Sequence, residues 1–226
     1  MSTEPGSSGA MRIGVLGGTG PQGRGLALRL AVAGHRIAIG SRDGERAASC
    51  AAELAAVRPG LDVTGLGNAG AAEHSELVIV AVPWAGHAEL LTGLGSELAG
   101  KIVVDCVNPL GFDERGAHRL EVAEGSAAEQ AAALLPGSRV VAAFHHVSAV
   151  LLLDPALADV DTDVLVLGDD RDATDAVQAL AAQIPGIRGV YGGRLRNAGQ
   201  VETLTANLIE VNRRYKTHAG IRVTGL

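Results

Sequence analysis

The sequence predicts an α/β protein with a doubly wound, parallel sheet and helices on both of its faces. Short apolar segments typical of strands alternate with longer, helix-like segments through the first half of the chain. These strands are apolar along almost their whole length, as parallel strands buried on both faces are. The 226 residues are 47% hydrophobic but only 2% aromatic, so the predicted core is aliphatic.

Strands and helices alternate regularly up to residue 107. The first apolar run stops at Gly17, and the helix after it stops at Gly34, which suits a helix C-terminus. Pro59 and Pro83 mark the ends of two later elements. The expected order is strand 11–16, helix 20–33, strand 36–40, helix 43–57, strand 61–66, helix 69–74, strand 77–82, helix 85–98 and strand 101–107.

The pattern is less regular after Pro109. Residues 110–125 are polar and contain glycine, which predicts a long loop. The remaining expected elements are helix 126–135, strand 139–144, strand 162–167, helix 170–183, strand 187–191 and helix 196–212. There is no internal repeat, and no segment has the composition of a linker between domains.

Charge, cysteine content and apolar run length argue against several classes of protein. A net charge of -6 and a pI of about 5.6 argue against a general nucleic-acid binder. Cys50 and Cys106 lack CxxC spacing, which argues against a disulfide scaffold or a metal site and fits a reducing cytoplasm. Residues 1–10 predict a disordered tail and not a signal peptide, because they are polar and lack a basic segment. The longest apolar run, residues 77–84, is too short to cross a bilayer, so no membrane partner is expected.

A glycine motif follows the first predicted strand. Gly18-Thr19-Gly20-Pro21-Gln22-Gly23 matches GxGxxG and opens a helix within a strand–helix–strand unit, which is the context of a Rossmann dinucleotide site. Gly18 is expected to permit a tight turn, Gly20 to let a pyrophosphate approach, and Gly23 to let the helix pack on the strand. Amide groups at the helix N-terminus would hold the phosphate charge. The alternative is a glycine-rich turn without a ligand.

The end of the second strand indicates which dinucleotide binds. The acidic residue usual in NAD enzymes is replaced by Ser41, and Arg42 follows directly. A hydroxyl and a guanidinium suit a 2′-phosphate, and Arg46 on the same helical face can add a second cation. We interpret Asp43 as the N-cap of the next helix. The prediction is therefore NADP, with a solvated helix start as the alternative for both arginines.

Three further strand ends lie at the same predicted edge of the sheet. Val82 and Trp84 follow the fourth strand and Asn108 the fifth, where an open parallel sheet binds its ligand. Val82 and Asn108 are candidates to contact the nicotinamide. Ordinary packing and a plain turn are the alternatives for Trp84 and Asn108. His145 and His146 follow the sixth strand, with structural hydrogen bonding as their alternative role.

The motifs together resemble a known family. Residues 13–30, with Ala33-Gly34-His35 and Gly40-Ser41-Arg42, are similar to the F420-dependent NADP oxidoreductases, also called NADPH:coenzyme F420 reductases. Val82-Pro83-Trp84, Phe144-His145 and the helix at 195–212 resemble them too. The resemblance extends from about residue 11 to residue 226. The chain departs from the family after Asp105, and Val150-Leu151-Leu152 replaces a smaller, more polar stretch.

The resemblance implies a division of the chain and a set of ligand contacts. Residues 11–150 are expected to form the NADP-binding Rossmann domain, and residues 151–226 a small C-terminal extension of strands and helix that encloses the deazaflavin. Thr19, Gly20, Pro21 and Gln22 would wrap the pyrophosphate, while Ser41, Arg42 and Arg46 would bind the 2′-phosphate. Val82, Asn108 and Ala149 would line the nicotinamide end. A homodimer is the family expectation.

The implied chemistry is hydride transfer between NADP(H) and the deazaflavin coenzyme F420. The coenzymes carry this reaction, so neither a catalytic acid–base pair nor a metal is expected, and the chain's task is positioning. His145, His146 and Trp84 are the candidate deazaflavin contacts. Residues 194–226 carry a net charge of +4, and Arg213 and Arg214 are candidates to attract the anionic coenzyme tail. A helix end with dipole-matching cations, or a subunit contact, is the alternative.

Two other functions fit the cofactor motif. A hydroxyacid or imine dehydrogenase is one, but such enzymes need a large helical second domain, and here one long helix follows the last strand. Some of them use a catalytic lysine, whereas Lys101 begins a strand and Lys216 lies near the chain end. A non-catalytic NADPH-binding sensor is the other. Only the quality of the pocket for a second ligand distinguishes it from the reductase.

Overall fold

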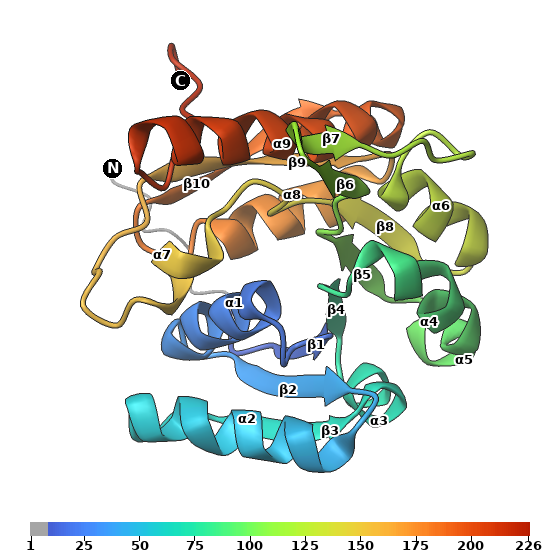
Figure 1. The fold of residues 1–226 in the computed structure, drawn as a ribbon. Helices are drawn as coiled ribbons and strands as arrows, with labels where there is room; N and C mark the ends of the chain where they lie inside the picture. Colours follow the sequence, from blue (N-terminus) through green and yellow to red (C-terminus); the bar gives the residue numbers. More distant parts are fainter. Residues whose placement is uncertain (1–8) are drawn as a thin grey trace, which may run out of the picture.

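The computed structural model describes residues 9–226. Most of the predicted tail at residues 1–10 therefore lies outside the described residues, and residues 9 and 10 have no regular structure. The described chain builds one eight-stranded sheet in the order β10-β9-β8-β5-β4-β1-β2-β3, covered by helices (Figure 1). None of the helices in residues 9–226 is both long and apolar enough to span a membrane.

Six parallel strands form the larger part of this sheet, and their order is that of a Rossmann fold. The central strand β1 is buried on both faces after its first residue, which explains its unbroken apolar run. The elements are β1 (Arg12–Leu16), α1 (Pro21–Val32), β2 (Arg36–Ser41), α2 (Gly44–Val57), β3 (Val63–Gly67), α3 (Asn68–Glu73), β4 (Leu77–Val80), β5 (Ile102–Asp105), α6 (Ala127–Leu134) and β8 (Arg139–Ala142).

The core has two layers, one on each face of the sheet, as the doubly wound prediction requires. One layer packs α1, α2 and α8 (Arg171–Ala181) against the sheet, with Leu26, Leu54 and Val177 among its buried side chains. The other packs α3, α4 (His87–Gly93), α6 and α9 (Ala198–Tyr215), with Leu91 and Val201 buried. Most buried side chains of both layers are aliphatic, and Phe144 is the one aromatic side chain among the buried members of these layers within residues 9–226, in agreement with the composition.

The last two strands extend the same sheet. β9 (Thr162–Gly168) pairs antiparallel with β8, and β10 (Ile187–Gly193) then pairs parallel with β9. The sheet is therefore mostly, not wholly, parallel. The elements that complete this half are α8 (Arg171–Ala181), the 3₁₀ turn η2 (Leu195–Asn197) and α9 (Ala198–Tyr215), which runs across one end of the molecule above β9 (Figure 1).

Three elements differ from the sequence prediction. The helix expected at 85–98 is a 3₁₀ turn η1 (Trp84–Gly86) followed by two short helices, α4 (His87–Gly93) and α5 (Gly95–Leu98), because glycines interrupt it. The loop expected at 110–125 contains a hairpin of β6 (Leu110–Asp113) and β7 (Gly116–Arg119). A short helix that was not predicted, α7 (Ala149–Leu153), packs on α1.

Candidate functional site

The glycine motif forms a tight turn between β1 and α1. The positive φ of +70° falls on Gly17, one residue before the predicted position. The Gly18 amide donates to the carbonyls of Val15 and Gly40, each at 3.1 Å, so the turn is tied to both β1 and β2. A Cβ on Gly23 would lie 2.7 Å from the Cα of Gly18. The prediction that Gly23 lets the helix approach the strand is confirmed in this respect.

The N-terminus of α1 is open toward the carboxyl edge of the sheet. Gly20 is the N-cap and offers no side chain, Pro21 opens the helix, and the first turn holds no acidic residue. A Cβ on Gly20 would meet only the Gly17 carbonyl, at 3.4 Å, so packing alone does not require glycine there. Uncapped amides and free space suit a phosphate at this point. Thr19 is half-buried beside them, whereas the Gln22 side chain donates to the Phe144 carbonyl at 3.2 Å.

The end of β2 presents two cations. The Asp43 carboxylate accepts from the amides of Glu45 and Arg46, which confirms its interpretation as the N-cap of α2. The buried Ser41 hydroxyl accepts from the Asp43 amide at 3.2 Å. Arg42 and Arg46 are exposed, and their guanidinium groups form no hydrogen bond or ion pair with any residue in 9–226. Both guanidinium groups are therefore available to an anionic ligand.

The ends of β4 and β5 lie beside the glycine turn. A Cβ on Gly17 would lie 2.7 Å from a methyl carbon of Val82, so Val82 borders the turn directly. Trp84 is half-buried, and its ring centroid lies 5.4 Å from that of His87. The Asn108 amide donates to the His145 carbonyl at 2.8 Å. The Asn108 amide oxygen is buried and has no partner among the described residues, so it can accept from a ligand.

His145 enters the site through an unusual backbone turn. Phe144, directly before it, has a φ of +64° although it is the bulkiest fully buried side chain. Such strain persists where surrounding contacts fix it, often at functional sites. Both ring nitrogens of His145 are buried without a partner among residues 9–226. Burial lowers the pKa of His145 to about 4 despite the nearby Asp105 carboxylate, so the ring is neutral at pH 7 and has one donor and one acceptor.

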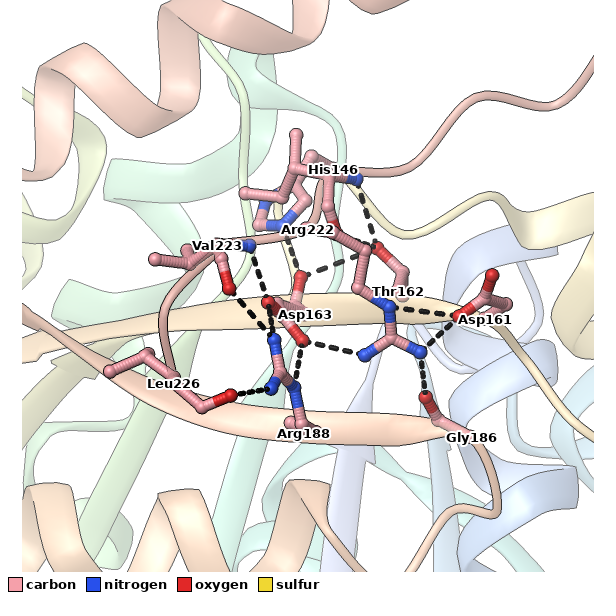
Figure 2. A network of polar contacts seen from close by, with 10 residues as sticks. His146, Asp161, Thr162, Asp163, Gly186, Arg188, Arg222, Val223 and Leu226 are labelled. Carbon is pink, nitrogen blue, oxygen red and sulfur yellow. Dashed lines mark hydrogen bonds and ion pairs between the residues drawn. The ribbon is translucent and has the colours of Figure 1, made fainter.

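His146 faces another part of the molecule. Its Nε2 donates to the Asp163 carbonyl on β9 at 2.8 Å, as Figure 2 shows. Burial lowers the pKa of His146 as well, and its Nδ1 has no partner in the described chain. The two neighbouring histidines therefore point to different surroundings, and His146 belongs to the network around Asp163.

The short helix α7 carries Ala149 to the side of α1. A Cβ on Gly25 of α1 would lie 2.6 Å from the Leu152 Cβ, so the two helices are in close contact. The buried Arg29 guanidinium donates to four carbonyls of this segment, those of Leu151, Leu152, Asp154 and Leu157. Sequence reasoning missed Arg29, since one arginine in a helix is usually solvated.

A cavity of about 950 Å³ opens between α9 and the segment after β7. Its lining includes Pro109, the neighbour of Asn108, and Thr203 of α9. Two residues farther along α9, the Thr205 hydroxyl donates to the His145 carbonyl at 3.0 Å. Arg119 and Arg196 lie in its wall, and sequence reasoning missed both. Arg213 and Arg214 lie beyond its lining at the exposed C-terminal end of α9, where Arg213 pairs with Glu210 at 3.5 Å.

Comparison with known proteins identifies the family. The chain is 43% identical to an F420-dependent NADP reductase of Methanothermobacter marburgensis over 96% of this chain and 99% of the relative. The chain belongs to the F420-dependent NADP reductase family. A reductase of the same name from Methanocaldococcus jannaschii is 39% identical over 96% of this chain and 99% of the relative. A family model described as "NADP oxidoreductase coenzyme F420-dependent" matches residues 12–109.

Solved structures extend the comparison to the fold. A proposed F420-dependent NADP reductase from Arthrobacter sp. FB24 superposes with a TM-score of 0.82 and 30% identity, over 95% of this chain and 100% of that one. An imine reductase of Streptomyces aurantiacus superposes with a TM-score of 0.58 and 23% identity, over 89% of this chain and 61% of that one. The second likeness shows the fold alone. The predicted resemblance to F420-dependent NADP reductases is confirmed.

Proposed function

We propose that this chain binds NADP(H) and coenzyme F420 side by side and that hydride passes directly between them. Full-length similarity to F420-dependent NADP reductases carries the proposal. The open helix N-terminus, the two free arginines and the unpartnered atoms of Asn108 and His145 support it, because they lie along one edge of the sheet. When both coenzymes are bound they supply the chemistry: a hydride moves between nicotinamide C4 and deazaflavin C5, with a proton balancing the deazaflavin.

The Rossmann domain at residues 11–150 would bind the nicotinamide coenzyme. Gly18, Thr19, Gly20, Pro21, Gln22 and Gly23 form the proposed pyrophosphate site, and Ser41, Arg42 and Arg46 the proposed 2′-phosphate site. At the nicotinamide end, the free oxygen of Asn108 would accept from the carboxamide, and Val82 and Ala149 would pack against the ring. The turn geometry and the unpaired cations support this assignment.

Residues 151–226 would complete the enclosure of the deazaflavin. We place the ring beside His145 and Trp84, where a neutral imidazole can donate to or accept from it without adding charge. His146 would hold the segment that carries His145 in place through its hydrogen bond to the Asp163 carbonyl on β9. The cavity at α9 would admit the anionic tail, with Arg119 and Arg196 in its wall and Arg213 and Arg214 attracting the tail from farther away. The chain's part in the reaction is to hold two rings at about 3 to 3.5 Å and to exclude water.

Two further proposals concern the cellular setting. A cytoplasmic location is supported by the buried, free Cys50 and Cys106. A homodimer follows the family expectation, and light scattering after size-exclusion chromatography tests it. A mass of one 22.9 kDa chain would contradict the dimer.

The proposed function is tested by mixing the protein, NADPH and oxidised coenzyme F420 without oxygen and following the deazaflavin absorbance. We expect the absorbance to fall in step with NADPH oxidation. Binding of NADPH with no change in the deazaflavin would instead favour the NADPH sensor. Turnover of a cyclic imine or a hydroxyacid without F420 would favour the dehydrogenase.

A further inference from the structure

A buried histidine–carboxylate pair lies directly behind the nicotinamide end of the site. His87 is the first residue of α4 and Asp105 is the last of β5, and both side chains are fully buried. The Nε2 of His87 lies 2.6 Å from an oxygen of Asp105. Neither side chain has a role in the proposed hydride transfer, and the sequence did not single them out.

The hydrogen bonds indicate the charge of the His87 ring. Its Nδ1 lies 3.0 Å from the amide oxygen of Gln130, and the amide nitrogen of Gln130 donates to Glu124 at 3.2 Å, which fixes the amide orientation. Both ring nitrogens thus face acceptors, and an imidazolium, which carries a proton on each ring nitrogen, satisfies both of them. Burial lowers the pKa of His87, but Asp105, Gln130 and Glu202 together raise it above its ordinary value.

The pair contacts two segments that border the proposed coenzyme sites, that of Trp84 beside the deazaflavin and that of Asn108 beside the nicotinamide. On one side, the His87 ring lies 5.4 Å from the Trp84 ring, within the roughly 6 Å reach of a cation–π interaction. On the other side, the second oxygen of Asp105 accepts from the Val107 amide at 2.9 Å and so fixes the turn that carries Asn108. One buried ion pair therefore holds the ends of β4 and β5 together.

We propose that His87 is a positioning residue: held as an imidazolium by Asp105 and Gln130, it fixes Trp84, which we place beside the deazaflavin, and the Asn108 turn, which we place at the nicotinamide. The proposal rests on the proposed function for the identity of these two rings. It predicts that deprotonation of His87 loosens both strand ends, because the neutral ring loses a donor to Asp105 or to Gln130. The effect on hydride transfer would be indirect, through the placement of the nicotinamide.

The titration of His87 must be distinguished from that of other titratable groups nearby. Besides Asp105 on β5, the carboxylate of Glu202 on α9 acts on it, and Glu124 reaches it through Gln130. Glu202 accepts from the amides of Ala127 and Ala128 at the start of α6, and burial raises its pKa to about 7. A pH effect near neutrality can therefore arise from either His87 or Glu202.

Trp84 is the single tryptophan of the chain, so its fluorescence reports on His87 without any coenzyme. A protonated imidazole quenches a neighbouring indole. We expect the Trp84 emission of the coenzyme-free protein to rise with pH, with a midpoint above the ordinary histidine pKa of 6.5. The step should be lost in His87→Gln, persist in Glu202→Gln, and persist in His74→Gln, whose histidine is exposed at the C-terminal end of α3.

An unchanged step in His87→Gln would overturn the imidazolium assignment, and so would a wild-type midpoint below 6.5. If His87→Gln does not fold, Asp105→Asn takes its place. Its neutral amide should move the midpoint below 6.5, and an unmoved midpoint would contradict the proposal.

The positioning role has its own readouts. In His87→Gln, we expect the turnover number for deazaflavin reduction to fall about tenfold, because a small misplacement of the reacting ring is costly. The affinity for adenosine 2′,5′-bisphosphate, which tests only the distant adenosine end, should stay within about twofold. The nicotinamide fluorescence of bound NADPH should weaken.

Unchanged turnover and unchanged NADPH fluorescence would show that the pair is structural only. If wild-type protein fails to reduce the deazaflavin, the proposed function fails. The Trp84 titration and the NADPH fluorescence still test the pair, because neither needs coenzyme F420.

Discussion

The three glycines around the phosphate turn have separate physical roles. Gly17 adopts a left-handed conformation, with a φ of +70°, which residues with a side chain rarely adopt. Gly23 is required by packing, because a Cβ there would overlap the backbone of Gly18. Gly20 is required by neither, because its Cβ would reach only ordinary contact. A ligand is the remaining reason for glycine at position 20.

The first prediction compares Gly20→Ala with Gly23→Ala. Gly20→Ala should leave the melting temperature unchanged and weaken NADP binding about tenfold, because the methyl group occupies the space of the phosphate. Gly23→Ala should destabilise the fold by about 2 kcal/mol through overpacking. Calorimetry of unfolding and of NADP binding measures both effects. Normal NADP affinity in Gly20→Ala would count against the phosphate site.

The second prediction concerns the choice between NADP and NAD. Arg42→Ala should raise the KM for NADPH about tenfold or more and leave the KM for NADH nearly unchanged, because only NADPH carries the 2′-phosphate. Arg36→Ala is the matched control: this exposed arginine lies at the opposite end of β2 and pairs with Asp62. Equal effects of Arg42→Ala on both coenzymes would place the 2′-phosphate elsewhere.

At the residue scale, the sequence allows prediction of interactions between residues that are close together in the chain. The cap at Asp43 was predictable, because it satisfies amides two and three residues away. The lack of hydrogen-bond partners for the Asn108 oxygen and the His145 ring nitrogens was not predictable, because it depends on which donors and acceptors the neighbouring strands place near them. The positive φ lies on Gly17, one residue before the expected glycine. The motif fixes only the spacing of the glycines, whereas the hydrogen bond to β2 fixes the conformation of the turn.

At the scale of elements, helices α1 and α7 are in direct contact beside the candidate site. Arg29 extends from α1 and holds the α7 segment through four carbonyls, while burial lowers its pKa. The helix whose N-terminus we propose as the phosphate site thus also positions Ala149, which we propose for the nicotinamide end.

The third prediction tests this link. Arg29→Met should lower the free energy of unfolding by about 3 kcal/mol, because it leaves one buried and three partly buried carbonyls without their donors. Arg24→Met is the control on the same helix: Arg24 forms a partly exposed ion pair with Glu53, and its loss should cost about 1 kcal/mol or less. Urea unfolding measures both variants. Similar costs for the two would show that the four carbonyls find other donors.

Element boundaries were predictable where a period or a stop residue marked them. The helix expected at 85–98 was wrong as one helix because Gly86, Gly93 and Gly95 allow breaks that the apolar spacing hides. The hairpin at residues 110–119 was missed because its strands are short and half polar. α7 was missed because a five-residue helix has too few turns to show a period.

At the scale of the whole molecule, a network of ion pairs and hydrogen bonds holds the last residues of the chain against β9. The fully buried Asp163 carboxylate accepts from Arg188, Arg222 and the Val223 amide, and Arg222 also contacts Asp161 (Figure 2). The hydrogen bonds from Arg188 lower the pKa of Asp163 most, with smaller contributions from Val223 and Arg222, so the folded state holds it ionised. Because His146 donates to the Asp163 carbonyl, this network reaches the segment that carries His145.

The fourth prediction follows from that lowered pKa. Asp163 stabilises the fold fully above its ordinary pKa of 3.8, and the contribution is lost as the pH falls below that value. At pH 7, Asp163→Asn should therefore lower the free energy of unfolding by about 3 kcal/mol, because two arginines lose a buried partner. Asp161→Asn, with an exposed carboxylate, should cost about 1 kcal/mol or less.

Urea unfolding between pH 3 and 7 measures both variants. The difference between wild type and Asp163→Asn should be constant well above pH 3.8 and should shrink as the pH falls from there to 3, because the unfolded chain then takes up a proton while the folded state keeps Asp163 ionised. A difference that stays constant down to pH 3 would contradict the linkage.

The fifth prediction concerns long-range attraction of the coenzyme tail. Replacing Arg213 and Arg214 with alanine should raise the KM for coenzyme F420 at low salt and flatten its salt dependence, because neither arginine lies in the cavity wall. Arg119→Ala should raise the KM at all salt concentrations through a lost contact. An unchanged KM at low salt in the double variant would remove the attraction.

The arrangement of the six parallel strands was predictable from the sequence, and the arrangement of the part of the chain from β9 onward was not. Alternating strands and helices imply parallel crossovers, but nothing in residues 143–161 signals that β9 reverses direction against β8. Asp163, Arg188 and Arg222 are also far apart in the chain, so their meeting depends on that reversal. The cavity at α9 follows from the same closure.

The central claim is that hydride passes directly from one bound coenzyme to the other. The most direct test uses NADPH deuterated at C4, in each of the two stereochemical forms, with oxidised coenzyme F420 and the purified protein. One form should deliver its deuterium quantitatively to deazaflavin C5, and the other should deliver none, because the site holds one face of each ring against the other. Loss of the deuterium to solvent, or equal transfer from both forms, would contradict the account.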